Sequence, residues 1–248
     1  MGKLIKEKSI FGWNKDSMSW SAYFSWVGSK ESYRKKYYVE NRVDFSTLET
    51  AFGNKIGKLL ENNHPSLAHI KKYSHPEYKI EVEIGGYKFI GYIDSFDLKT
   101  KSILEYKTSH KNKKGEHQWN HVKVSQHQQL DLYSLMVQKK FGKVKNLCEL
   151  IYMETKFNDK KLTYKGRTFQ KRKALKLVGK PKTFKRTILQ WERDAMEKRI
   201  LKVANEIKED YARLQKNGRN KTPKKPSDKG PLPRDAEKVS RSKTPKKI

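Results

Sequence analysis

The chain lacks the residues on which several classes of protein depend. It contains one cysteine, Cys148, so neither an internal disulfide nor a four-cysteine iron–sulfur cluster can form. No apolar run approaches the length of about 20 residues that a membrane-spanning helix needs. The lysine-rich first residues also lack the apolar segment of a secretion signal. We therefore expect a cytoplasmic protein that has no membrane partner.

Negative charge is also scarce. The 248 residues include 27 acidic against 57 basic side chains, which gives a formal net charge of +30. An excess of this size points to a polyanionic partner, and nucleic acid is the leading candidate. An anionic membrane surface is the alternative. It is disfavoured because the sequence has no basic amphipathic helix with a strongly apolar face.

The C-terminal third changes in composition twice. Residues 187–215 carry apolar side chains near helical spacing, which predicts a long amphipathic helix that packs on or extends a domain formed by residues 1–186. Residues 216–248 hold 12 basic against 3 acidic side chains, five of the eight prolines and no aromatic residue. Such a segment buries too little surface to offset its ordering entropy. We expect a disordered basic tail that attracts phosphate groups non-specifically.

The domain itself reads as a mixture of helices and strands. Ser19, and Ser29 or Ser32, are suited to cap two helices within residues 17–43. Residues 156–186 are too basic and irregular to assign. The remaining pattern predicts a helix at 46–63, strands at 78–84, 87–94 and 101–109, a helix at 122–142 and a strand at 144–154. This order indicates an α/β protein with a mixed sheet.

Basic and aromatic side chains alternate in the second of the two N-terminal helices. Arg34, Lys35 and Lys36 stand between Tyr33 and Tyr37. These side chains can contact a nucleic-acid backbone or stack on bases. Equally, the tyrosines can belong to the core and the charges to its solvated rim.

Three polar residues fall on two neighbouring predicted strands. Asp94 ends the second strand, and Glu105 and Lys107 lie two residues apart on the third, so that they share one face. Antiparallel pairing would bring the two carboxylates together, which is unfavourable unless a cation such as Mg²⁺ lies between them. A metal held there can activate water and neutralise a phosphoryl oxygen, while Lys107 orients or deprotonates the water. The alternative is a surface salt-bridge ladder.

The neighbouring motifs add weight to the metal hypothesis. "GYID" (91–94) followed by "ILEYKTS" (103–109) and "QLDLY" (129–133) resembles the RecB-like branch of the PD-(D/E)XK nuclease superfamily. There, a G-x-x-D strand precedes (D/E)-x-K-(T/S) and a Q-x-x-x-Y helix. Upstream, "SWSAYFSWVGSKESYRKKYYVE" is similar to the family's entry helix and "AFGNKIGKLLE" to its G-x-x-x-H helix. The resemblance covers roughly residues 17–135.

The resemblance implies a role for each matching residue. Asp94 and Glu105 would bind the metal together with the backbone carbonyl of Tyr106, and Lys107 would be the catalytic lysine. Gln129 and Tyr133 would face the site, where they contact DNA or order the lysine. The alternative for Tyr133 is core packing. Gln126 lies on the same helical stripe and would also contact DNA.

One departure from the family pattern concerns the metal. Gly57 occupies the position where the family commonly has a metal-binding histidine or glutamate. Glu61, one turn further along the same stripe, could supply this ligand, or the ligand is missing. The four cysteines of relatives that carry an iron–sulfur cluster are also missing, so no such cluster is expected.

The fold and function follow as implications of the resemblance. We expect a restriction-endonuclease-like core with a long C-terminal helix. The implied function is a Mg²⁺- or Mn²⁺-dependent DNA nuclease, an exonuclease of recombination, repair or replication. It is of a type frequent in phages and could work with a single-strand annealing or helicase partner in the bacterial host cytoplasm.

Three alternatives remain open at this stage. A non-catalytic DNA-binding module on a decayed nuclease fold would explain Gly57. An RNA-directed protein would carry the same charge. A zinc site at His117, His121 and His127 is disfavoured, because zinc requires three or four ligands in a defined geometry.

Overall fold

The computed structural model describes residues 11, 17–40, 47–144, 147–158, 163–164, 167–168 and 174–219. The elements follow one another as β1 (Ser17–Ser19), α1 (Trp20–Gly28), α2 (Lys30–Tyr33), the π-helical turn η1 (Arg34–Glu40), α3 (Leu48–Glu61), the 3-10 turn η2 (Pro65–Leu67), β2 (His75–Ile84), β3 (Tyr87–Asp97), β4 (Ser102–Ser109), α4 (His121–Ser125), α5 (Gln128–Phe141), β5 (Leu147–Asn158), β6 (Thr163–Tyr164), β7 (Arg167–Thr168), β8 (Ala174–Thr187) and α6 (Gln190–Arg219).

A mixed sheet forms the centre of the molecule. Its strands follow the order β1-β3-β4-β5-β8, and β2 pairs with β3 as well. The pairs β1–β3 and β4–β5 are parallel, whereas β2–β3, β3–β4 and β5–β8 are antiparallel. The parallel pair β4–β5 is joined by the crossover that contains α4 and α5, as a parallel connection requires. The predicted α/β class with a mixed central sheet is therefore confirmed.

One edge of β3 is shared by two partners. β2 pairs along nearly the whole length of β3, so β1 and β4 must both lie on the opposite edge. On that edge β1 pairs with residues 88–90 and β4 with residues 95–97. Residues 91–94 lie between these two ladders, where β4 separates from β3. We call this separation of the two strands the fork, and the motif residue Asp94 lies in it.

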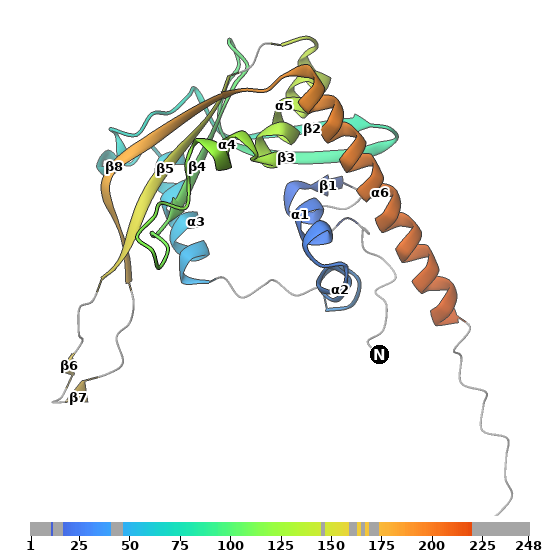
Figure 1. The fold of residues 1–248 in the computed structure, drawn as a ribbon, viewed down its shortest axis with the longest axis horizontal. Helices are drawn as coiled ribbons and strands as arrows, with labels where there is room; N and C mark the ends of the chain where they lie inside the picture. The colour runs from blue at the N-terminus through green and yellow to red at the C-terminus, as the bar shows by residue number, and fades with distance from the viewer. Residues whose placement is uncertain are drawn as a thin grey trace, which may run out of the picture.

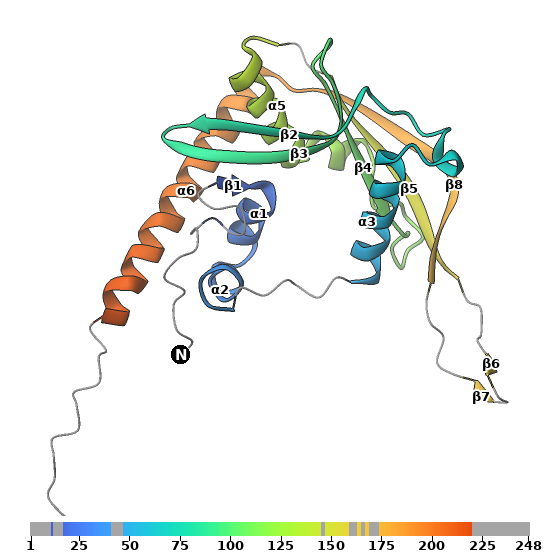
Figure 2. The ribbon, with the colours of Figure 1, turned by 180° about the vertical axis from the view of Figure 1, so that it is seen from behind.

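Helices cover both faces of the sheet. The larger buried cluster joins α1, α5 and α6 to the strands and includes Trp26, Leu130 and Ile200. The smaller cluster places Ile56 and Leu60 of α3 against β4 and β5 on the other face. Figure 1 shows α6 running past α1 on one side of the molecule, and Figure 2 shows α3 beside β4 and β5. Within the described residues, no helix combines the length and the apolarity that crossing a membrane requires.

The predicted elements that depend on local signals are confirmed. Ser19 caps α1 and Ser29 caps α2, each by accepting a backbone N–H bond at 3.2 Å. The β2–β3 hairpin turns at Gly85 and Gly86, which have φ of +58° and +78°, as a two-residue turn of this kind needs. The long C-terminal helix runs from Gln190 to Arg219. The rest of the predicted basic tail lies outside the described residues.

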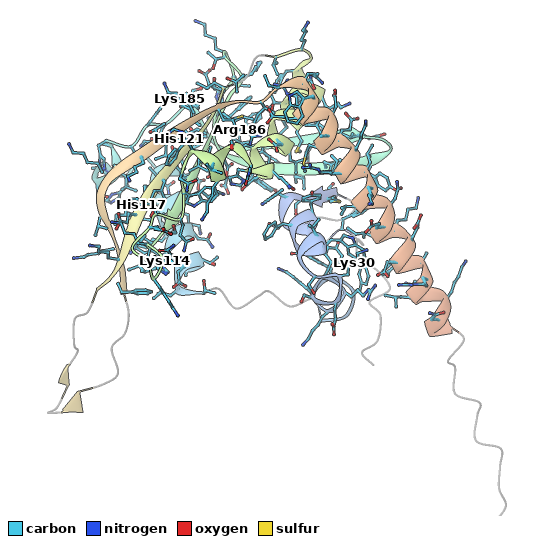
Figure 3. All side chains as sticks on the ribbon, viewed as in Figure 1. Lys30, Lys114, His117, His121, Lys185 and Arg186 are labelled. Atoms are coloured by element: carbon cyan, nitrogen blue, oxygen red, sulfur yellow. The ribbon has the colours of Figure 1, made fainter. Side chains whose placement is uncertain are left out.

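The predicted single helix at 122–142 is wrong, because the segment forms two helices. α4 ends at Ser125, and α5 begins at Gln128 with His127 as its N-cap. Arg186 of β8 donates hydrogen bonds to the carbonyl oxygens of Val124 at 3.1 Å and His127 at 3.4 Å. Figure 3 labels Arg186 beside α4. A distant arginine therefore adds hydrogen bonds to two carbonyl groups at the break, which also accept the backbone N–H groups of His127 and Leu130.

The long strand β8 covers the end of the unassigned stretch 156–186 and also Thr187, which was predicted to begin the C-terminal helix. Pro181 and many lysines obscured it, because both are unfavourable in a central strand. β8 lies at the edge of the sheet, where both are common. The register also shifts between Tyr152 and Glu154 of β5, opposite Gly179 with φ of +69°. This bulge accommodates the proline.

A buried ion pair fastens the N-terminal helices to α6. Arg34 donates to both carboxylate oxygens of Asp210, at 2.8 and 2.7 Å, and Arg213 donates to the same carboxylate at 2.7 Å. Burial alone would raise the pKa of Asp210, but the hydrogen bonds from Arg34 and Arg213 outweigh it and hold this pKa below its ordinary value. The Arg34 guanidinium is thus engaged within the fold.

We predict that Asp210→Asn lowers the free energy of unfolding by about 1–3 kcal/mol, because it leaves Arg34 partly buried without its charged partner. Chemical denaturation measures the change. Glu209→Gln, an exposed neighbour on the same helix, serves as the control and should change stability by less than about 0.5 kcal/mol. Equal stability of the two variants would contradict the structural role of the pair.

Candidate active site

Two carboxyl groups meet in the fork between β3 and β4. The antiparallel register pairs Ser95 with Leu104, and one further step along it places Asp94 opposite Glu105. Asp94 accepts the backbone N–H of Tyr106 at 2.7 Å. The Asp94 carboxylate is also near enough to Glu105 to raise the pKa of that carboxyl group. The sequence-predicted pair is therefore brought together by the strand pairing itself.

This pair is placed where two negative charges are costly. Glu105 is only 1% exposed. Burial, and next the neighbouring Asp94 carboxylate, raise the pKa of Glu105 to about 8, although Lys107 opposes the rise. Burial also raises the pKa of Asp94. Without a bound cation, the pair therefore retains a proton near neutral pH, since two adjacent carboxylates in a desolvated site cannot both ionise.

Lys107 connects the carboxyl pair to α5. Its Nζ donates to Glu105 Oε2 at 3.2 Å and to Gln129 Oε1 at 2.9 Å. Gln129 Nε2 in turn donates to the Tyr133 hydroxyl at 3.1 Å. That hydroxyl donates to the backbone carbonyl of Tyr92 at 3.0 Å.

The direction of this chain of bonds is fixed by its ends. A lysine ammonium can only donate, and a backbone carbonyl can only accept. Gln129 must therefore present its oxygen to Lys107 and its amide to Tyr133. The side chains of Gln129 and Tyr133, one helical turn apart, orient Lys107 towards Glu105. Tyr133 is also buried in the core, so the two interpretations of this residue both apply.

Gly91 makes room for this arrangement. A Cβ atom at position 91 would lie 2.8 Å from Cε1 of Tyr133 and 3.3 Å from Cγ2 of Ile80. The Tyr133 ring and the Ile80 side chain are both buried in the core, so neither can move aside to admit a methyl group. The glycine of the "GYID" segment is required because α5 packs directly onto β3 at this point.

A second carboxyl pair lies beside the first. Glu77 lies between Pro76 and Tyr78, which pair with Ser95 and Ile93 on either side of Asp94, and it has a left-handed φ of +46°. Partial burial, the Glu61 carboxyl group and Asp94, in that order, raise the pKa of Glu77. Glu61, on the last turn of α3, is therefore next to Glu77, and Glu77 is next to Asp94.

Glu77 was not found by sequence reasoning. In "EYKIEVEI" it is the first of a series of alternating charged residues, which is the pattern of the solvated face of a hairpin. Its left-handed backbone conformation coincides with a gap in the β2–β3 ladder. No sequence signal marks this conformation at a glutamate.

A comparison with protein families matches the model of the PD-(D/E)XK nuclease superfamily over residues 30–222. This match covers most of the chain and contains the whole fork. The chain belongs to the PD-(D/E)XK nuclease superfamily. No curated protein matches the sequence. Among solved structures, a protein from Eubacterium rectale, provisionally described as an exonuclease, is similar at 10% identity and a TM-score of 0.36, over 82% of this chain and 70% of that one.

The residues present fit the divalent metal that the PD-(D/E)XK superfamily implies. Glu105 Oε1 is buried and has no hydrogen-bond partner among the described residues, whereas Lys107 occupies Oε2. An unsatisfied carboxylate oxygen beside a second carboxylate is a donor set suited to a hard cation. In the described part of the chain, however, no three acidic, histidine or cysteine side chains already converge on one point.

Other predicted DNA-contact residues of this PD-(D/E)XK domain belong to elements other than β3 and β4. Gln126 is exposed at the end of α4, so it does not continue the α5 stripe of Gln129. Lys35 is exposed, and Lys36 lies over the ring of Tyr37 at 5.4 Å. Tyr33, Tyr37 and Tyr38 are buried.

The three histidines of the zinc alternative are dispersed. His117 lies 3.6 Å from Glu154 and edge-on to Tyr152, and His121 lies edge-on to Phe184. Figure 3 labels these two histidines at different places along the sheet. His127 has a separate role at the start of α5. The three side chains therefore do not form one site.

We predict that Gly91→Ala lowers the free energy of unfolding by about 1–3 kcal/mol, because the added methyl group displaces Tyr133 from a tightly packed position. Gly57→Ala is the matched control. Position 57 has open space around the built Cβ within helix α3, so this change should increase stability by up to about 1 kcal/mol. Thermal and chemical denaturation of both variants measure the difference, and destabilisation by both would contradict the explanation.

We also predict that the metal-free protein loses stability as the pH rises from about 4.5 to about 8. The raised pKa of Glu105 means that the folded state binds more protons than the unfolded state in this window. The stabilising contribution is complete below the unfolded pKa and is lost as the pH passes the folded one.

Urea denaturation in EDTA at pH 5 and pH 8.5 tests this dependence. Glu105→Gln should weaken this dependence, and Glu81→Gln, an exposed glutamate on β2, should leave it unchanged. Part of it remains in Glu105→Gln, because burial also raises the pKa of Asp131 to about 6. An undiminished pH dependence in Glu105→Gln would show that Glu105 is not responsible.

Proposed function

We propose that this chain is a divalent-metal-dependent deoxyribonuclease that hydrolyses phosphodiester bonds, and that it acts as an exonuclease. One observation carries the proposal. A buried carboxyl pair, Asp94 and Glu105, stands beside the ammonium group of Lys107, and one carboxylate oxygen lacks any partner within the described residues. Membership of the nuclease superfamily supports the same conclusion.

Asp94, Glu105 and the carbonyl of Tyr106 would hold Mg²⁺ or Mn²⁺, and Glu61 would complete the ligand set from α3. Such an ion, when bound, activates water and neutralises charge on the phosphoryl group. Because the ion favours the ionised forms of both carboxyl groups, the shared proton has to leave when it binds. This makes metal binding tighter as the pH rises.

Lys107 has the position of a group that acts on the attacking water or on the phosphate. Its three protons allow it to donate to Glu105, to Gln129 and to one further acceptor. The chain from Tyr133 through Gln129 fixes the side chain, so that the third proton points to a constant place. An ammonium group fixed in this way stabilises developing charge without reorganisation.

Hydrolysis assays on labelled DNA test the proposal. We expect Mg²⁺-dependent cleavage by the wild type, and a loss of about a hundred-fold or more in Lys107→Ala and Glu105→Gln, since each removes a group that acts on the reacting atoms. Lys79→Ala, an exposed lysine on β2, is the matched control and should retain activity. Undiminished cleavage by Lys107→Ala would overturn the assignment.

The choice of substrate separates the finer claims. Cleavage of linear but not circular DNA identifies an exonuclease, and RNA of the same sequence tests polymer preference. A non-catalytic module is favoured by one observation, which is that no third metal ligand converges on the carboxyl pair in the described structure. Salt-sensitive DNA binding by the wild type without Mg²⁺-dependent cleavage would establish that alternative.

A further inference from the structure

Four aromatic rings that the carboxyl site does not use form a continuous row beside it. Phe24 and Trp20 belong to α1, His127 caps α5, and Trp119 precedes α4. The centroids of Phe24 and Trp20 are 5.6 Å apart. Trp20 and His127 are separated by 6.3 Å, and His127 stacks on Trp119 at 4.9 Å with an interplanar angle of 25°.

The row is open to solvent along part of its length. Phe24 is 62% exposed, and Trp20 and Trp119 are half-buried, so each keeps ring surface that no neighbour covers. Tyr23, the residue beside Phe24, fixes this end of the row by donating to Gln128 Oε1 at 3.0 Å. The exposed rings are thus held in place on a rigid part of the fold.

His127, which lies between Trp20 and Trp119 in the row, is linked through Gln129 to the proposed catalytic lysine. His127 Nδ1 accepts the backbone N–H of Gln129 at 3.4 Å, and Gln129 holds Lys107 at 2.9 Å. Since Nδ1 accepts a hydrogen bond, the imidazole proton lies on Nε2. That atom is buried and has no partner among the described residues.

The charge state of His127 suits contact with bases. Burial, and next the positive charges of Lys107 and Arg186, lower the pKa of His127 to about 3. The ring is therefore neutral at physiological pH and stacks as an aromatic group.

We propose that Phe24, Trp20, His127 and Trp119 form a stacking platform for the unpaired bases of a single-stranded nucleic-acid end on its way to the carboxyl pair. This inference deepens the proposed function and rests on it. Aromatic rings bind unpaired bases through their faces without regard to sequence, whereas in a duplex those faces are covered by neighbouring bases.

Cations near the row suit the sugar–phosphate backbone of such a strand. Lys123 of α4 is exposed and lies four residues after Trp119, and the exposed Arg199 of α6 lies near Tyr23. A purely apolar protein partner would gain nothing from these charges. The rings would contact the bases, and the lysine and arginine would contact the phosphates. This combination therefore favours a nucleic-acid strand over an apolar partner.

Binding measurements test the platform independently of cleavage. Binding of a labelled oligothymidylate can be measured by fluorescence anisotropy, in Ca²⁺ to prevent hydrolysis. Phe24→Ala should raise the Kd roughly five-fold or more. Trp191→Ala is the matched control, because Trp191 is 66% exposed but lies outside the row. A Kd for Phe24→Ala equal to that of the wild type would overturn the proposal.

A substrate lacking its bases gives the decisive comparison. An oligonucleotide with abasic sites at its terminal positions keeps its phosphates, so Phe24→Ala should bind it as tightly as the wild type does. Equal weakening on abasic and base-bearing strands would instead identify a backbone contact and reject stacking. Trp119→Ala should repeat the selective loss, with thermal melting to confirm that the variant is folded.

Two further arms separate this proposal from the nuclease assignment. A blunt duplex should show little effect of Phe24→Ala, and a selective effect on the single strand supports the platform even if no Mg²⁺-dependent cleavage is found. Conversely, cleavage that depends on Lys107 together with unchanged single-strand binding in Phe24→Ala would retain the nuclease and reject the platform. A matched RNA strand shows whether the shared base chemistry extends to both polymers.

Discussion

Two carboxyl groups confined to one desolvated place determine how the rest of this domain is arranged. Asp94 and Glu105 lie where the ladder between β3 and β4 ends, and Glu105 is buried there. The site therefore needs positive charge from elsewhere, because adjacent buried carboxylates repel strongly. Lys107 and the N–H of Tyr106 supply part of it. Because Glu105 Oε1 has no partner among the described residues, the remaining positive charge has to come from a bound cation.

The packing of helix α5 against β3 fixes the side chains that orient Lys107. α5 approaches β3 closely because Gly91 has no side chain, and Tyr133 then reaches the carbonyl of Tyr92. The start of this helix is fixed by Arg186, which is anchored by Asp131 at 2.6 Å and by Glu192 at 2.7 Å. Gln129 and His127 occupy its first turn. The orientation of Lys107 thus depends on contacts that extend across the sheet to β8.

Much of the fold and the centre of the site could be predicted from the sequence because their signals are local. The Gly85-Gly86 turn sets the hairpin, and the spacing of Glu105 and Lys107 sets a common face. The helix break at His127 could not be predicted, because the compensating donor is Arg186, which is 59 residues away along the chain. Glu77 was hidden for a similar reason, since alternating charge looks the same whether a side chain faces solvent or a carboxyl site.

The sequence by itself determined the α/β class, the order of most elements, the basic character and the three residues at the fork, since periodicity, turn residues and motif spacing act over short distances. Tertiary structure alone decided that β8 completes the sheet, and that Glu77 approaches both Glu61 and Asp94. It also decided that Phe24, Trp20, His127 and Trp119 form one row. These contacts join segments separated by up to about a hundred residues. They depend on how the helices and strands pack against one another, which no local pattern of residues specifies.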